Sequence, residues 1–122
     1  MTLPIRQLAR AGLLLAGAAI ALAALLPSLS PPGQHNLDKI VHLGAFALLA
    51  FLAVMGYQNE RRRWTALFAI AGLAVGMEIA QSFVPGRVGS FKDAAASLAG
   101  LPVGYLGGWL AERLFKPVTS RL

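Results

Sequence analysis

The stretch Gly72–Ser97, GLAVGMEIAQSFVPGRVGSFKDAAAS, decides how this chain folds. It begins as an apolar segment that contains Glu78 and Gln81, turns at Pro85, and enters a second apolar segment at Asp93. A charged side chain in such an apolar setting is costly, so it needs a partner or a function. The stretch therefore predicts two helices joined by a turn, with a polar site close to that turn.

The composition of the whole chain is that of a membrane protein. Of its 122 residues, 57% are hydrophobic and only 13% are charged, whereas a soluble domain carries about 25% charged residues. The net charge of +6 does not indicate nucleic-acid binding, because the Lys and Arg residues lie between apolar segments, as topology signals do. The chain has no cysteine, which excludes disulfides, thiolate metal sites and a cysteine nucleophile.

Four apolar segments predict an all-α fold, a four-transmembrane-helix bundle that forms a single domain over residues 1–122. We expect the helices at about residues 8–26, 39–57, 64–84 and 93–115. The first segment follows Arg6 and Arg10 and stops at Pro27, a pattern that also fits a secretory signal peptide. A membrane helix is favoured because no clean A-x-A cleavage site follows it.

The distribution of basic residues predicts the orientation. Eight of the 11 Lys and Arg residues lie in the N-terminal region, the central connection 58–63 and the C-terminal tail. The connections 27–39 and 85–92 hold the other three. The positive-inside rule then predicts that both termini are cytoplasmic and that these two connections are extracytoplasmic.

Small and capping residues predict how the helices begin and pack. Asp38 is expected at the N-cap of the second helix, and Ser90 at the N-cap of the fourth with Asp93 three positions later. Pro102 is expected to kink the fourth helix. Glycines spaced by four residues suit close helix contact, and two helices carry such stripes: Gly72 and Gly76 on the third, and Gly100, Gly104 and Gly108 on the fourth. We therefore expect the third and fourth helices to form the tightest pair. The same glycine faces could also join two copies of the chain in a homo-oligomer.

This topology brings polar residues from three regions to the extracytoplasmic side, where we expect one site. The candidate catalytic residues are His42, Glu78 and Asp93. The candidate binding residues are Asp38, Lys39, Gln81, Arg87 and Ser90.

The residue types at this site suit an anionic ligand. A carboxylate beside His42 would hold the imidazole in one tautomer. Arg87 and Lys39 would receive a phosphate or carboxylate, and the free amides at the start of the fourth helix would face the same ligand. The partner predicted here is an anionic group at the outer leaflet of the bilayer.

Each residue also has a structural alternative. Asp38 and Asp93 can serve as helix caps, Lys39 and Lys92 as interfacial side chains, and His42 as a packing residue. Gln81 can join helices, Arg87 can anchor the interface, and Glu78 can form a structural ion pair. A metal is a further alternative, since Asp38, His42, Glu78 and Asp93 offer oxygen and nitrogen ligands. A zinc site is only weakly supported, because the cluster contains one histidine and the other, His35, is expected in solvent. We therefore assign no metal ligand and no cofactor.

The order and spacing of these residues resemble the VanZ-like family of small bacterial membrane proteins. The matching motifs are Asp38-Lys39-x-x-His42, Glu78-x-x-Gln81, Pro85-x-Arg87, and Asp93 with Gly100, within about residues 37–108. The chain departs from the pattern at Phe46, where the family often has Tyr, and at Ser97, where it usually has Asn. The resemblance implies a bacterial inner-membrane location, an envelope role and a link to glycopeptide (teicoplanin-type) tolerance.

Three functions remain open from the sequence. The first is an envelope protein that binds an anionic lipid or a lipid-linked glycan group. The second is a membrane-embedded hydrolase or transferase that uses His42 with a carboxylate. The third is a non-catalytic assembly partner that packs through its glycine faces. A transporter is disfavoured because four short helices enclose little of a path.

Overall fold

Four α-helices make up the described part of the chain. The computed structural model describes residues 3–25, 35–83 and 91–115. The helices are α1 (Leu3–Leu25), α2 (His35–Gly56), α3 (Glu60–Gln81) and α4 (Phe91–Phe115). All four are long and apolar enough to cross a membrane, so the expected all-α class with four helices of membrane-spanning length and composition is confirmed.

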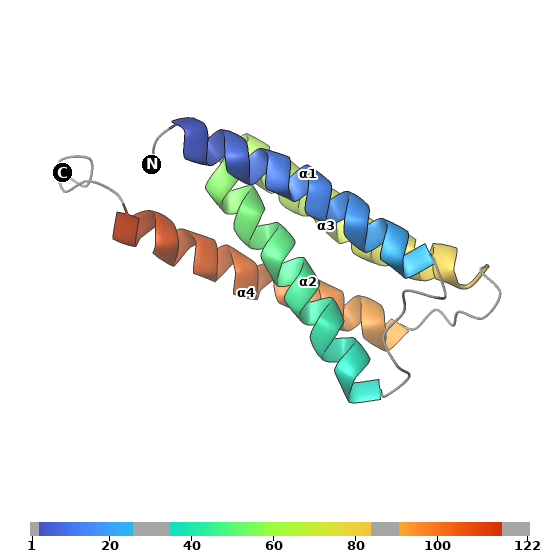
Figure 1. Cartoon of the computed structure of the whole chain (residues 1–122). Coiled ribbons are helices and arrows are strands. Elements are labelled where there is room, and N and C mark those ends of the chain that lie inside the picture. Colours follow the sequence, from blue (N-terminus) through green and yellow to red (C-terminus); the bar gives the residue numbers. More distant parts are fainter. Residues whose placement is uncertain (1–2, 26–34, 84–90, 116–122) are drawn as a thin grey trace.

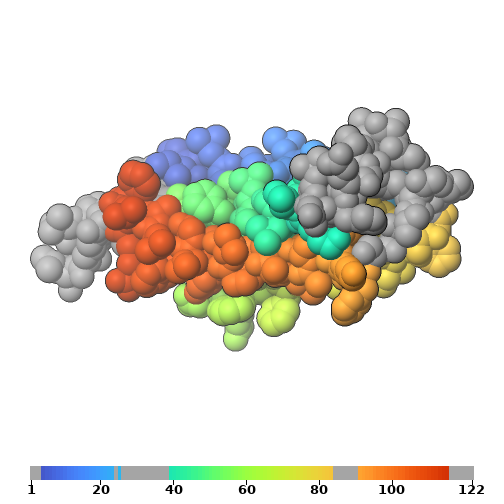
Figure 2. Space-filling view, turned by 90° about the horizontal axis from the view of Figure 1, so that it is seen from below, coloured from blue at the N-terminus to red at the C-terminus, as the bar shows by residue number. Residues whose placement is uncertain are grey.

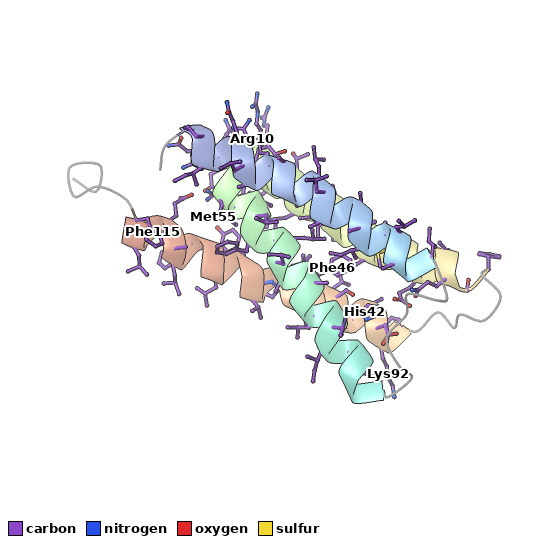
Figure 3. All side chains as sticks on the ribbon, viewed as in Figure 1. Arg10, His42, Phe46, Met55, Lys92 and Phe115 are labelled. Atoms are coloured by element: carbon purple, nitrogen blue, oxygen red, sulfur yellow. The ribbon has the colours of Figure 1, made fainter. Side chains whose placement is uncertain are left out.

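Consecutive helices run in opposite directions along the bundle (Figure 1). The start of α1, the end of α2, the start of α3 and the end of α4 lie at one end of the bundle, which we call the arginine end because Arg6, Arg10 and Arg63 lie there. The end of α1, the start of α2, the end of α3 and the start of α4 lie at the other end. We call this the histidine end, after His42 (Figure 3).

All four helices begin earlier than the sequence pattern predicts. α1 begins at Leu3 and so includes Arg6, which was expected to precede it. α2 begins at His35, so Asp38 lies inside the helix and its predicted N-cap role is wrong. α4 begins at Phe91 with Asp93 in its first turn; the predicted cap Ser90 lies outside the described residues.

The arginine run is helical, although it was expected in a loop. Asn59 caps α3, because its side-chain oxygen accepts hydrogen bonds from the amides of Arg61 (2.9 Å) and Arg62 (3.3 Å). A short polar side chain at the N-cap satisfies amides that have no partner within the helix. Arginine is also a good helix former, so α3 starts at Glu60 and carries Arg61, Arg62 and Arg63 in its first turn.

The apolar core joins α2 and α3. Phe46, Leu49, Ala50 and Ala53 line one face of α2, at the spacing of three or four residues that a helix face requires. They pack with a matching stripe of α3, which consists of Leu67, Ile70, Ala74 and Met77. α1 covers this core with a narrow stripe of Leu13, Ala16 and Ile20, and its other side chains are largely exposed, as suits a helix that faces lipid.

The closest helix pair is α2 with α4, which corrects the prediction that α3 and α4 form it. Figure 2 shows α4 running along the molecule against α2. A Cβ atom added at Gly100 or Gly104 would collide with the backbone oxygen of Leu43 or Ala47, and one added at Gly108 would lie 2.8 Å from Val54 Cβ. The glycine stripe of α4 is therefore used inside the monomer, against α2.

The contact between α3 and α4 is looser because large aromatic side chains hold the two helices apart. Trp64 and Tyr105 stack with their ring centroids 5.9 Å apart. Beside them lies an apolar groove of about 300 Å³, lined by Trp64, Leu67, Phe68, Ala71, Leu101, Pro102 and Tyr105. α4 continues through Pro102 to Phe115.

Replacing Gly104 tests the close contact of α2 and α4. Gly104→Ala places a methyl group against the backbone of α2, and overpacking of this kind costs about 1–3 kcal/mol. We expect a lower thermal stability of the purified protein in detergent, measured by a temperature series with size-exclusion chromatography. Gly76→Ala is the matched control, since a Cβ atom there meets nothing within 4 Å. Equal stability of the two variants would contradict this account.

Candidate functional site at the histidine end

His42, Glu78 and Asp93 meet at the histidine end, as the sequence predicted. His42 lies on α2, Glu78 in the last turn of α3 and Asp93 in the first turn of α4. His42 Nε2 lies 3.3 Å from Glu78 Oε1. One side-chain nitrogen or oxygen atom from each of the three residues lies within 4.8 Å of the other two. Three helices thus contribute one polar side chain each to a single cluster.

The cluster is largely shielded from its surroundings. The Glu78 side chain is 8% exposed and the His42 side chain 16%, while Asp93 is half-buried. Phe46, one turn deeper than His42 on α2, is fully buried, and so are Ala74 on α3 and Ser97 on α4. Each of these three residues lies one helical turn from a member of the cluster, on the side of the core, so buried side chains form a layer beneath the cluster.

The position of Glu78 opposes the field of its own helix. A helix carries partial negative charge at its C-terminal end, where carboxylates are disfavoured, and Glu78 is three residues from the end of α3. Asp93 is different, because an acidic side chain in the first turn of α4 is favoured by the helix dipole. Helix electrostatics therefore account for Asp93 but not for Glu78, whose position depends on its neighbours in the cluster.

The other predicted site residues are placed as follows. Gln81 is buried on α3, three residues after Glu78, and Lys39 is half-buried on α2, three residues before His42. Lys92 is exposed on α4. Asp38 lies in α2, but its side chain is outside the described part of the structure. Arg87 and Ser90 lie outside the described residues, so their predicted roles stay predictions.

A second polar cluster, at the arginine end, was not predicted. Arg63 Nη2 donates to Glu112 Oε2 at 2.9 Å, and Arg6 Nη2 lies 3.7 Å from the same oxygen. All three side chains are buried. Figure 3 shows Arg10 of α1 and Met55 of α2 at this same end.

The arginines also cap α2. Its last four carbonyls have no amide partner within the helix. That of Ala53 accepts from the Tyr57 amide just after the helix (3.1 Å), and the other three accept hydrogen bonds from guanidinium groups. Arg63 donates to Val54 O (2.9 Å), Arg6 to Met55 O (3.2 Å) and Arg10 to Gly56 O (2.8 Å). Arg63 also donates to Tyr57 O (3.0 Å), one residue beyond the helix. Positive charge at a helix C-terminus is favourable, so this cluster has a complete structural explanation.

A sequence signal for this second cluster existed. The alternating topology brings Arg6, Arg63 and Glu112 to one end by the same reasoning that brings His42, Glu78 and Asp93 to the other. The arginines were interpreted only as topology signals, because three of them were assigned to a loop.

Comparison with known protein families identifies the family of this chain. A family model described as VanZ/LLP1 matches residues 7–112. The chain belongs to the VanZ/LLP1 family. The resemblance noted from the sequence is thereby confirmed, and the matched region contains His42, Glu78 and Asp93. Searches of curated proteins and of solved structures return no match.

Glu112 allows a test of the arginine end. Glu112→Gln keeps the shape of the side chain but removes its charge, which leaves Arg63 and Arg6 buried without their carboxylate. Loss of one partner from a buried ion pair costs about 3–5 kcal/mol, so we expect a marked fall in thermal stability in detergent.

Glu60→Gln is the matched control for that change. Glu60 also approaches Arg63 (3.8 Å), but its side chain is 70% exposed, and exposed pairs contribute about 0–1 kcal/mol. A loss of stability in Glu60→Gln as large as in Glu112→Gln would contradict the assigned role of Glu112.

Proposed function

We propose that this VanZ/LLP1 protein binds the anionic group of an envelope lipid or lipid-linked glycan at its histidine end. The observation that carries this proposal is the meeting of His42, Glu78 and Asp93, from three helices, beside the apolar core of the bundle. Ionisable residues inside membrane segments are costly, and they mark ligand or ion sites more often than not. The buried carboxylate of Glu78, at the disfavoured end of α3, supports a functional reason for its presence.

The proposal includes an orientation, in which the histidine end faces the outside of the bacterial inner membrane. Among the described residues, the arginine end carries Arg6, Arg10, Arg61, Arg62, Arg63 and Arg113, whereas the histidine end carries Lys39 and Lys92. The positive-inside rule places the arginine-rich end in the cytoplasm. An outward-facing site would meet lipids of the outer leaflet and the glycan carriers attached to them.

The anionic character of the ligand is inferred from the positive groups at this end. Lys39 on α2 and Lys92 on α4 carry positive charge, and the first amides of α4 lie at the same end. The N-terminus of a helix favours anions through its free amides and its dipole. Arg87 would add two parallel donors suited to a phosphate or carboxylate. The link to glycopeptide tolerance belongs to this proposal, since such a ligand lies in the envelope.

One geometric observation favours a second candidate, a hydrolase or transferase. His42 Nε2 and Glu78 Oε1 are 3.3 Å apart, a separation at which a carboxylate can orient an imidazole. A histidine oriented in this way can act as a general base toward a substrate hydroxyl or water. In this alternative the same end of the bundle holds the substrate, and His42 carries the proton.

Of the two glycine stripes that suggested assembly into an oligomer, only the one on α3 remains available. The stripe of α4 is occupied by α2, so it is not open to a second copy of the chain. Gly72 and Gly76 on α3 have nothing within 4 Å of an added Cβ atom. A homo-oligomer built through glycines would therefore use α3.

A complementation panel tests the proposed site. In a strain that lacks the protein, we expect four variants to accumulate in the membrane at wild-type level and yet fail to restore envelope integrity and teicoplanin tolerance: His42→Ala, Glu78→Gln, Arg87→Ala and Asp93→Asn. Glu60→Gln, at the exposed start of α3, is expected to complement fully. Full function of the four variants, or failure only through degradation, would show that the cluster is structural.

The binding and enzymatic alternatives are separated by His42→Gln. Glutamine keeps hydrogen-bonding capacity but cannot serve as the general base, whose loss reduces turnover by about 10²–10⁴-fold. If the protein only binds, His42→Gln should complement and should retain binding to vesicles that contain an anionic lipid. If it is an enzyme, the variant should fail in the cell while vesicle binding persists.

A further inference from the structure

We propose that His42, Glu78 and Asp93 form a binding site for one divalent transition-metal cation such as Zn²⁺. The inference does not depend on the proposed function, because it concerns the donor atoms alone. It also revises the sequence-based expectation that the chain has no metal ligands.

The spacing of the donor atoms suits a shared ion. Ligands at about 2.0–2.2 Å from a tetrahedral Zn²⁺ lie about 3.3–3.6 Å from one another. His42 Nε2 and Glu78 Oε1 already stand 3.3 Å apart. The donor atoms of all three residues lie within 4.8 Å of one another, so closing the site requires a movement of at most about 1.5 Å. A change of side-chain rotamer at half-buried Asp93 supplies a movement of that size.

The donor types are those of a catalytic-type metal site. One imidazole and two carboxylates suit Zn²⁺ or Mn²⁺, and three protein ligands leave a further coordination position for water or a bound oxygen. Each ligand comes from a different helix, α2, α3 or α4, so the ion would join three segments that are far apart in the sequence. The buried layer of Phe46, Ala74 and Ser97 closes the site from below.

Charge balance supports the same assignment. A divalent cation with two carboxylates and a neutral imidazole has no net charge, the state that an apolar surrounding favours. The cation would also stabilise Glu78, whose carboxylate otherwise opposes the dipole of α3. Lys39 is a competing source of positive charge at this end, and a direct binding measurement separates the two possibilities.

The test measures binding to the purified full-length protein. The protein is isolated in detergent through a tag without histidines, stripped with a chelator, and titrated with Zn²⁺ by calorimetry, with bound metal counted after dialysis. We expect one ion per chain. His42→Ala, Glu78→Gln and Asp93→Asn should each weaken binding by at least about tenfold, because even the outer-shell partners of metal ligands contribute 10–100-fold.

Two controls and a second measurement complete the design. His35→Ala removes the other histidine of the chain and Glu60→Gln removes a remote carboxylate; both should bind Zn²⁺ like the wild type. Zn²⁺ should also raise the melting temperature of the wild type but not that of Asp93→Asn, a variant that keeps the shape of the side chain. Absence of binding in the wild type, or binding lost in His35→Ala and retained in His42→Ala, would overturn the proposal.

Discussion

The close crossing of α2 and α4 is the constraint on which both polar ends depend. Gly100, Gly104 and Gly108 allow the two helices to approach so closely that a methyl group added at any of these glycines would collide with α2. This approach fixes α4 relative to α2 along most of its length. Asp93 is thereby set beside His42 at one end, and Glu112 is set beside the last carbonyls of α2 at the other. A looser pairing would separate the members of both clusters.

The two ends of the bundle show different relations between charge and helix polarity. At the arginine end, positive side chains meet the carbonyl end of α2, so the electrostatics of the helix and of the side chains agree. At the histidine end, the carboxylate of Glu78 lies at the carbonyl end of α3, where the negative side chain meets the negative end of the helix dipole. Proteins tolerate such local conflicts mainly at functional sites. This difference favours a stabilising role for the arginine end and a binding role for the histidine end.

The fold and the meeting of three candidate residues could be predicted because they depend on patterns that a sequence displays directly. Apolar segments long enough to span the bilayer gave the four helices, and their alternation brought His42, Glu78 and Asp93 together. Which two helices pack most closely was not predictable in the same way, because Gly72 and Gly76 show the same spacing as Gly100 and Gly104. Only the opposing surface decides which stripe is used, and the aromatic pair of Trp64 and Tyr105 keeps α3 and α4 apart. The arginine cluster was missed since the cap at Asn59 turns a predicted loop into helix.

Phe46 and Ser97, the two positions where the chain departs from the pattern of its family, mark the depth at which the polar cluster ends. Phe46 follows His42 by one turn of α2 and is 0% exposed, while Ser97 follows Asp93 by one turn of α4 and is 1% exposed. Phenylalanine brings no hydroxyl that would need a partner, and serine is small enough to continue the glycine stripe toward Asp93. Both residues thus favour close packing directly beneath the cluster. A packed layer at that depth supports a site that receives its ligand from one side of the membrane, and it argues against a transport path through a single bundle.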